Sequence, residues 1–471
     1  MFIPPTFKGA VVLLLPLVVV LSSCKHRSTA EFISIKDPVI ALKHVRVIDG
    51  TGSAAREDQT IIIDSGRIAA VGPTAEISVP ASAREVDLTG QTAIPGLVGM
   101  HDHLFYTTDR GDRDVVAGQS FAPLYLAAGV TTIRTTGAID LKADQSIKSS
   151  VDAGKLAGPK IHLTSPYINK RTGDSLDLPK VAGAINKFAD QGIESLKIYE
   201  NINRAELSSI VNAAHQRGLK VTGHLCAVGF TEAAQAGIDN LEHGLAVDTE
   251  FYSRKQPDEC PKRTEWLPEL ARLDVKSEPV ERLISELVSR HVAVTSTLPI
   301  FESFVEEKFE IDQRTREVLS DDAFTDCRTY LTEGKADPRW SRIWEKVFRN
   351  EMEFEREFVK AGGLLTAGVD PTGWGGVVAG FGDQRGVELL VQAGFTRLEA
   401  IRIATLNGAA FLGEDSRIGT IAPGKQADIV ILRGNPAANI GDIRNVEIVF
   451  KDGVGYDSRK LIESVRGTVG E

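Results

Sequence analysis

Eight stretches of β-forming residues, each followed by a helical stretch, constrain the fold of this 471-residue chain more than any other feature. Strands that alternate with helices form a parallel sheet. Eight such units over about 315 residues have the size of a (β/α)8 TIM barrel with insertions. We therefore predict the α/β class, with the barrel over residues 96–411. The expected strands are 94–103, 130–134, 160–164, 193–199, 219–224, 238–243, 291–297 and 363–370.

Short β-rich runs separated by turn residues occur at both ends of the chain, for example at 60–63 and 427–432. This texture is typical of short strands joined by tight turns. We predict that residues 39–95 and 412–460 together form one small β-sandwich, preceded by a linker over 24–38.

Two long charged stretches, 248–285 and 300–355, exceed what a minimal barrel needs. Their partly amphipathic pattern predicts helical insertions over the barrel mouth, which would restrict the mouth to small substrates. Trp340 and Trp344 are four residues apart and share one helix face, which we expect to be a packing seam.

The first residues resemble a bacterial export signal. Lys8 precedes an apolar stretch over 9–21 that is too short to span a bilayer comfortably. Leu21-Ser-Ser-Cys24 resembles a lipobox, which implies a signal peptide over 1–23 and a lipid on Cys24. The alternative is a plain secretory signal with an incidental cysteine. We expect an exported chain, anchored by lipid to the inner or outer membrane and facing the periplasm.

An oxidising compartment permits disulfides, and three cysteines remain after residue 24. Cys260 and Cys327 both lie in the helical stretch after the sixth strand, so we predict a bond between them. Cys226 follows His224 closely; we expect it to be a packed thiol, with metal ligation as the alternative. The formal net charge of −10 leaves no basic patch, which argues against nucleic acid as a partner and leaves oligomerisation open.

The first barrel strand ends on two histidines, His101 and His103. Side chains two positions apart in an extended chain point the same way, so both imidazoles face one point. Histidine is the commonest nitrogen ligand for transition metals. Alone, however, a His-x-His pair is a weak metal signal.

Further candidate ligands end other barrel strands. Lys197 lies on the fourth strand, His224 and His243 end the fifth and sixth, and Asp370 ends the last. The carboxyl ends of barrel strands meet at the face where such barrels have their active sites. Considered singly, Lys197 could be a structural lysine paired with Asp370, and each histidine could belong to the core. Their joint position predicts one metal centre.

This constellation resembles the amidohydrolase superfamily, in its binuclear form with a carboxylated lysine. Pro95-Gly-Leu-Val-Gly-Met-His-Asp-His103, Glu242-His-Gly244 and Thr366-Ala-Gly-Val-Asp370 look like its motifs. The branch that looks most similar is the imidazolonepropionase-like and Xaa-Pro dipeptidase-like group. The resemblance implies six metal ligands: His101, His103, Lys197, His224, His243 and Asp370.

The resemblance also implies a reaction. A lysine ammonium has no lone pair, so Lys197 would react with CO2 to give a carbamate that bridges two divalent ions. Zinc is the default metal, and manganese, iron or cobalt would also fit. The ions would activate a water, and Asp370 would act as general base and then general acid. Tyr199, Tyr106 and Arg134 are candidate substrate contacts.

The sequence thus predicts a metal-dependent hydrolase that cleaves the amide bond of a small molecule, with a dipeptide or an N-acyl amino acid as the favoured substrate. The same centre would support hydrolysis of a cyclic amide, a lactone or a phosphotriester. A catalytically silent receptor lipoprotein is an alternative of another class. A mononuclear deaminase is disfavoured by Lys197.

Overall fold

The computed structural model describes residues 28–108, 113–171, 174–305, 311–333, 338–373 and 376–471. The expected signal peptide and the expected lipidation site, Cys24, lie outside these residues. No helix among the described residues combines the length and the apolar character needed to cross a membrane.

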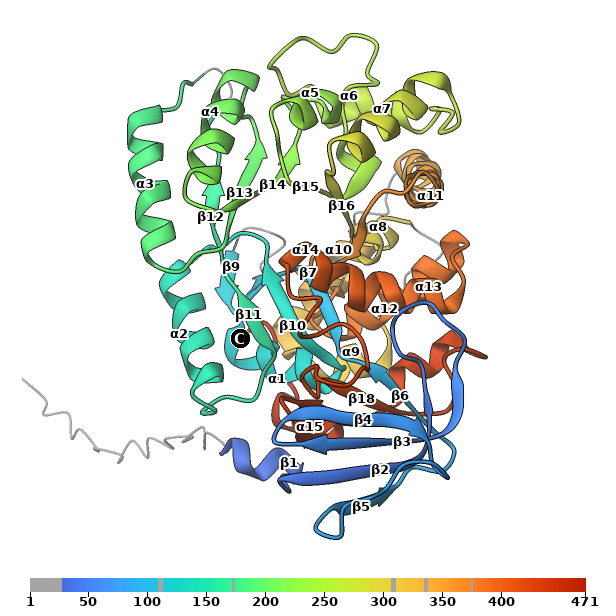
Figure 1. Cartoon of the computed structure of the whole chain (residues 1–471). Coiled ribbons are helices and arrows are strands. Elements are labelled where there is room, and N and C mark those ends of the chain that lie inside the picture. The colour runs from blue at the N-terminus through green and yellow to red at the C-terminus, as the bar shows by residue number, and fades with distance from the viewer. Residues whose placement is uncertain (1–27, 109–112, 172–173, 306–310, 334–337, 374–375) are drawn as a thin grey trace, which may run out of the picture.

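The two ends of the chain hydrogen-bond into one nine-stranded sheet, which lies at the bottom of Figure 1. β6 joins them, because it pairs antiparallel with β18 and parallel with β2. Apolar side chains such as Ile40, Ile61 and Ile431 give this sheet its own core. Its strands are β1 (Ile33–Ile35), β2 (Val39–Val47), β3 (Arg56–Asp64), β4 (Arg67–Pro73), β5 (Arg84–Asp87), β6 (Gln91–Pro95), β18 (Ile429–Arg433), β19 (Val446–Lys451) and β20 (Val454–Asp457).

Residues 28–35 are not the linker that the sequence pattern predicts. They form the 3-10 helix η1 (Thr29–Phe32) and β1, which pairs antiparallel with β20. The side chain of Ser28 caps η1, and Phe32 is buried. This segment therefore extends the small sheet by one strand.

The remaining parallel strands form the barrel, which confirms the predicted fold class. Hydrogen bonds from the Val369 and Asp370 amides to the His101 carbonyl, 3.1 and 2.9 Å, bring the segment after β17 beside β7. A bridge between Ala138 and Pro166 joins the segment after β10 to β12. The strands are β7 (Leu97–Asp102), β10 (Val130–Thr135), β11 (Lys160–His162), β12 (Thr164–Ile168), β13 (Ser195–Glu200), β14 (Lys220–Leu225), β15 (Asn240–Glu242), β16 (Ala293–Ser296) and β17 (Leu365–Ala367).

The strand expected over 94–103 is two strands, because the chain leaves the small sheet at Gly96 and enters the barrel. A Cβ at Gly96 would lie 2.0 Å from the Thr131 hydroxyl oxygen, so only glycine allows this close passage. The short hairpin of β8 (Phe105–Thr108) and β9 (Arg113–Val116) then precedes the first barrel helix.

Helices follow the barrel strands for local reasons that the sequence shows. Asp140 and Asn203 cap α2 and α4 through their side chains. In α7, Val280, Leu283, Ile284 and Leu287 form one buried face. The helices between strands are α1 (Gly118–Ala127), α2 (Leu141–Asp152), α3 (Leu178–Asp190), α4 (Arg204–His215), α5 (Phe230–Gln235), α7 (Glu278–Ser289), α11 (Pro338–Lys360) and α12 (Phe381–Ala393).

Additional short helices fill the expected insertions and the C-terminal part. The 3-10 helix η3 (Gly244–Val247) precedes the first insertion, which carries α6 (Arg263–Leu270). The second insertion carries α8 (Leu298–Glu302), α9 (Gln313–Val318) and α10 (Asp321–Glu333). After α12 come α13 (Arg397–Arg402), the π-helix η5 (Ile403–Asn407), α14 (Gly408–Leu412), η6 (Ile440–Arg444) and α15 (Ser458–Ser464).

Candidate metal centre and active site

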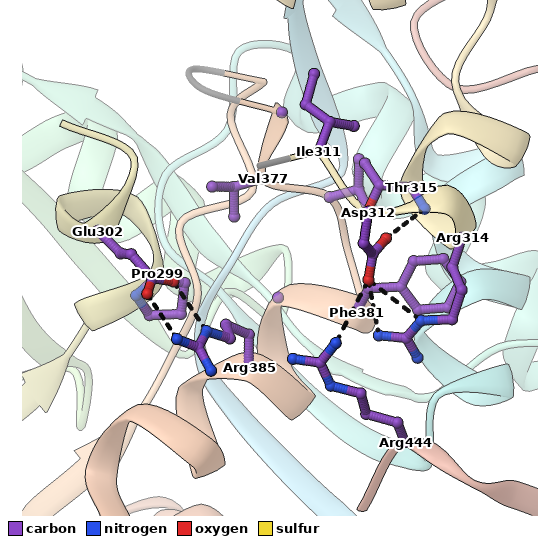
Figure 2. A pocket seen from close by; sticks show the side chains of 13 residues that line it. Pro299, Glu302, Ile311, Asp312, Arg314, Thr315, Val377, Phe381, Arg385 and Arg444 are labelled. Carbon is purple, nitrogen blue, oxygen red and sulfur yellow. Dashed lines mark hydrogen bonds and ion pairs between the residues drawn. The ribbon is translucent and has the colours of Figure 1, made fainter. Parts of the chain in front are cut away.

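One cavity contains charged side chains that are paired with one another. This second-insertion cavity, about 290 Å³, lies between α8, α9 and α12 (Figure 2). Arg385 donates to both Glu302 oxygens at 2.6 and 2.9 Å, while Arg314 and Arg444 lie 3.3 and 3.5 Å from the same Asp312 oxygen. Because each guanidinium has a carboxylate partner, this cavity offers little free charge to a ligand.

The larger cavity, about 580 Å³, lies at the carboxyl ends of the barrel strands, and we call it the mouth pocket. Its walls include parts of both insertions, among them Arg263 and Trp344. All six side chains that the sequence nominates as metal ligands line it: His101, His103, Lys197, His224, His243 and Asp370.

The backbone at two of these positions is strained. His243 comes directly after β15 and has a φ of 70°. Asp370 comes three residues after β17 and has a φ of 55°. Side-chain-bearing residues rarely adopt such values, and those that do cluster at functional sites. A Cβ at Gly368 would lie 2.3 Å from the His101 Cβ, so glycine lets the chain that carries Asp370 pass directly beside His101.

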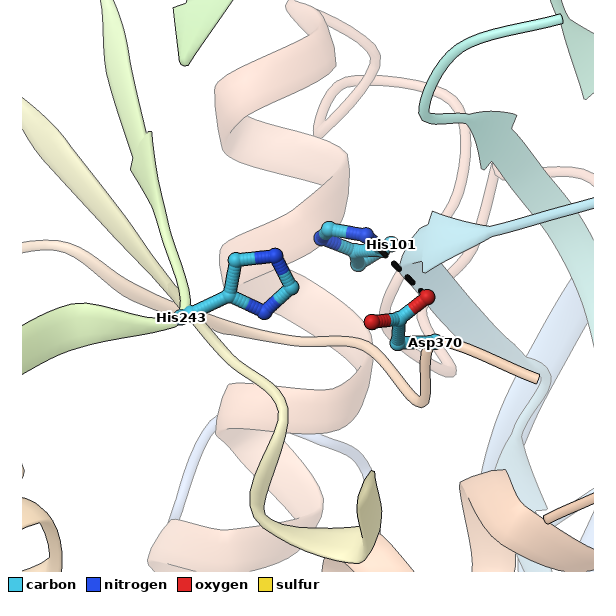
Figure 3. A group of neighbouring side chains, drawn as sticks. All are labelled: His101, His243 and Asp370. Carbon is cyan, nitrogen blue, oxygen red and sulfur yellow. Dashed lines mark ion pairs between the residues drawn. The ribbon is translucent and has the colours of Figure 1, made fainter. Parts of the chain in front are cut away.

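The side-chain atoms of the candidate metal-binding residues converge on a small volume. One atom each from His101, His243 and Asp370 lie within 4.8 Å of one another, and Figure 3 shows His243 facing the other two. Asp370 Oδ1 lies 3.2 Å from His103 Nε2 and 3.7 Å from His101 Nε2. The His243 ring centroid lies 4.5 Å from those of both His101 and His224. The donors therefore form one continuous group across the mouth pocket.

Each of three histidines is oriented through its other ring nitrogen. Nδ1 of His101 lies 2.7 Å from Glu242, and Nδ1 of His243 lies 2.8 Å from the Thr297 hydroxyl. Nδ1 of His103 lies 3.4 Å from the Gly137 carbonyl. This arrangement leaves Nε2 of each ring for a metal, and histidines that bind metals are usually held in this way.

Burial favours the neutral form of three of the imidazoles. It lowers the pKa of His101 and His243 well below the ordinary value and that of His224 to about 3. The positive charge of Lys197 adds to the effect on all three. Burial alone would raise the pKa of Asp370, but His101 and His103 outweigh it and hold this pKa below its ordinary value. Neutral imidazoles and an anionic carboxylate are the forms that bind metals.

Lys197 is 1% exposed inside the barrel. Burial lowers the pKa of its ammonium to about 8, although Glu242 and Asp370 act in the opposite direction. No ion pair within 4.0 Å joins this ammonium to Asp370 or Glu242 among the described residues, which removes the paired structural lysine as an explanation. A part of this lysine is therefore present as the neutral amine near physiological pH.

Glu242 is the residue at the centre that sequence reasoning did not single out. It is fully buried and accepts hydrogen bonds from Arg134 at 2.6 Å and Asn240 at 2.8 Å, and from Thr222. Burial would raise its pKa, but Arg134 and Lys197 hold it below the ordinary value. The signal was present in Glu242-His-Gly244, since residue 242 precedes a ligand on a strand of the barrel.

Two of the three candidate substrate contacts are wrong. Arg134 is fully buried beneath the pocket, where it binds Glu242 and the Met100 carbonyl rather than a substrate carboxylate. Tyr106 is 1% exposed and packs edge-on against Phe121. Tyr199 does line the mouth pocket, with its ring centroid 4.9 Å from that of His224.

The predicted disulfide is also wrong. Cys260 bonds to Cys226, with 4.9 Å between their Cα atoms, so Cys226 is neither a packed thiol nor a metal ligand. Cys327 is free and buried on α10, where its sulfur contacts the Gly373 carbonyl. The first insertion folds back over the end of β14, and both bonded cysteines line the mouth pocket.

Aromatic side chains of the second insertion close one side of the mouth pocket. Phe301 lies 5.9 Å from both His243 and Trp344 between ring centroids, and Phe304 lies 4.8 Å from Trp344. We expected Trp344 to lie in a packing seam. It does pack against other aromatic rings, but it also forms part of the wall of the mouth pocket.

Known proteins resemble this chain in both sequence and fold. Residues 92–250 and 365–455, more than half of the chain, match the amidohydrolase family. An imidazolonepropionase from Haloarcula marismortui is 35% identical over 109 residues, 22% of this chain and 26% of that relative. An adenine deaminase from a Chelativorans species is 26% identical over 236 residues, 46% of this chain and 36% of that relative. The chain therefore matches well under half the length of these two relatives.

Solved structures match over nearly the whole chain. A Xaa-Pro dipeptidase with bound methionine superposes with a TM-score of 0.65 at 21% identity, covering 89% of this chain and 100% of that one. A molinate hydrolase superposes with a TM-score of 0.67 at 18% identity, covering 91% and 96%. At these identities the likeness shows the shared fold. Given the match over more than half of its residues, the chain belongs to the amidohydrolase family.

Proposed function

We propose that this protein is a metal-dependent hydrolase that cleaves the amide bond of a dipeptide or an N-acyl amino acid. The observation that carries the proposal is the convergence of His101, His243 and Asp370 within 4.8 Å, in a pocket that His103, His224 and Lys197 also line. The structural likeness to a Xaa-Pro dipeptidase supports a dipeptide-sized substrate.

The donor set fits two divalent cations. His101, His103 and Asp370 would hold one ion, and His224 and His243 the other. The buried amine of Lys197 is suited to supply a carboxylate between the two ions. Its nitrogen lone pair can bond to the carbon of CO2 while one C=O π pair moves to oxygen, and the nitrogen then loses a proton to give a carbamate. The ions would lower the pKa of a bound water and polarise the amide carbonyl. Zinc is the default for a histidine-rich centre, and manganese, iron or cobalt would also serve.

Asp370 is placed to move the proton. Its lowered pKa keeps the carboxylate ionised, so it can accept the proton of the attacking water. As the carbon–nitrogen bond breaks, the same carboxylic acid returns that proton to the leaving nitrogen. The phenol of Tyr199, beside His224 on the pocket wall, is positioned to contact the substrate.

A second candidate is the opening of a cyclic amide. An imidazolone is a cyclic amide, and the relatives named imidazolonepropionases support this reading. Both candidates use the same centre and differ in the shape of the substrate.

The test is a metal measurement together with a substrate library. Purified protein should contain two divalent ions per chain and should hydrolyse members of a library of dipeptides, N-acyl amino acids and cyclic amides. Chelation should abolish turnover, and zinc or manganese should restore it. A protein that binds metal but turns over no amide would instead favour the receptor alternative.

We also propose that the chain is exported and held at a bacterial membrane by a lipid on Cys24. The disulfide between Cys226 and Cys260 supports an oxidising compartment. Labelling with a radioactive fatty acid tests the anchor: wild-type protein should be labelled, and Cys24→Ala should not. A protein that stays in the cytosolic fraction would contradict the proposal.

A further inference from the structure

The mouth pocket contains a second cationic side chain besides Lys197. Arg263 is the first residue of α6 in the first insertion, and its side chain is exposed at the pocket wall. No hydrogen bond or ion pair within 4.0 Å involves its guanidinium in the part of the chain that the structure describes. This distinguishes Arg263 from Arg134, which is buried and bonded to Glu242.

The guanidinium acts electrostatically on the His224 side of the pocket. Its charge lowers the pKa of His224 and opposes the burial effect that raises the pKa of Glu200 and Tyr199. These side chains all line the pocket. Arg263 is therefore close enough to the metal-binding side chains to meet a ligand bound there.

The disulfide fixes this arginine. Cys260 lies three residues before Arg263 and bonds to Cys226, two residues after His224. The ammonium of Lys255 also donates to the Ala227 carbonyl at 2.8 Å and to the Glu259 carbonyl at 2.6 Å. The segment before α6 is thus tied to the end of β14 at two places, so the backbone that carries Arg263 is held beside the end of β14.

Another part of the mouth pocket wall is aromatic. Phe301, Phe304 and Trp344 pack together, and Phe301 lies 5.9 Å from His243 between ring centroids. A ligand that reaches both parts meets a cation at one and an apolar wall at the other.

We propose that Arg263 is the specificity-determining residue that binds a free carboxylate of the substrate, while Phe301, Phe304 and Trp344 receive a large apolar group. The substrate class is therefore an amide that carries a carboxylate on one side of the scissile bond and a large apolar group on the other side. An Arg–carboxylate contact is charge-assisted and can be bidentate, which gives it both strength and directional preference. The inference rests on the proposed amide hydrolysis and specifies its substrate.

The experiment compares N-phenylacetyl and N-acetyl amino acids, each as the free acid and as the C-terminal amide. Wild-type protein should favour the free acid by about 10- to 100-fold in kcat/KM. Arg263→Gln should lose about that factor on the acid, mainly through KM, and lose much less on the amide, so that the preference for the acid disappears. Arg263→Lys should recover part of the loss. Arg272→Gln, an exposed arginine just after α6 that does not line the pocket, is the matched control.

A binding measurement separates this inference from the proposed function. An N-phenethyl amino acid has a methylene in place of the amide carbonyl, so it cannot be cleaved. Calorimetry should give a dissociation constant about 10- to 100-fold weaker for Arg263→Gln than for wild type. Equal binding, or equal turnover of acid and amide, overturns the role of Arg263 while amide hydrolysis stands. Absence of all amide turnover, with binding still dependent on Arg263, contradicts the proposed function instead.

Discussion

The mouth pocket and the second-insertion cavity both contain charged side chains, but they differ in whether those charges have partners inside the protein. In the second-insertion cavity, Arg385 and Arg314 meet Glu302 and Asp312 directly. In the mouth pocket, burial lowers the pKa of His101, His224 and His243, Lys197 has no ion pair with Asp370, and Arg263 has none within the described chain. Paired charges hold elements together, whereas donors and charges without partners are available to a metal or a substrate.

The comparison predicts that substitutions in one cavity change activity and those in the other change stability. The largest effect should come from Asp370→Asn, which removes the proton acceptor but keeps the side-chain shape. We expect kcat/KM on the best amide substrate to fall about 1,000-fold with the fold retained. Asp312→Asn in the second-insertion cavity is the control and should keep its activity. Similar losses in both variants would break the distinction.

A stability effect of comparable size should come from Glu242→Gln. This change leaves the buried guanidinium of Arg134 without its counter-charge, which costs about 3–5 kcal/mol when a buried ion pair is broken. The measurement is the free energy of unfolding in urea. Glu447→Gln, which removes a pair with the largely exposed Arg433, should cost less than about 1 kcal/mol. A small cost for Glu242→Gln would show that water or another group compensates Arg134.

The six candidate ligands could be placed from the sequence because their positions depend on two general rules. Side chains alternate along a strand, and the carboxyl ends of parallel strands share one face. The role of these six residues as metal ligands was implied by the resemblance to the amidohydrolase superfamily, and Asp370 lies three residues beyond the end of β17. The barrel itself followed from the same alternation of strands and helices.

Other positions depend on tertiary register, which a single sequence does not carry. Arg134 lies on a barrel strand, but its depth is set by pairing that places Thr135 opposite Asp102, so the guanidinium points below the mouth. The disulfide depends on how the first insertion folds over β14, and no local pattern relates Cys226 to Cys260. The same folding brings Arg263 to the pocket wall, and no local pattern in the sequence indicates this.

A smaller stability effect is expected in the second-insertion cavity. Arg385→Gln would leave Glu302, which is 3% exposed, without its bidentate partner. Because Arg385 itself is partly exposed, we expect a loss of about 2 kcal/mol in urea unfolding rather than the full cost of a buried pair. The kcat/KM should stay unchanged. Arg459→Gln on the surface should alter neither quantity.

The same rule about partners extends to two buried carboxyl groups on α11. Glu351 accepts a hydrogen bond of 2.7 Å from the Ala246 amide, and Glu355 lies beside it, fully buried. Burial raises the pKa of both groups, that of Glu355 to about 8. Unlike Glu242, this pair has no cation beside it among the described residues to hold it ionised.

A carboxyl group whose pKa is raised by folding binds more protons in the folded state than in the unfolded state. Its contribution to stability is complete below the unfolded value of about 4.3 and is lost as the pH rises through about 8. Glu355→Gln, which mimics the protonated form, should therefore match wild type at pH 4 and be more stable at pH 9, by at most about 5 kcal/mol. Urea unfolding at the two pH values measures this difference. If the variant and wild type differed in unfolding free energy by the same amount at both pH values, folding would not raise the pKa of Glu355. The absence of a cation partner would then not determine its charge.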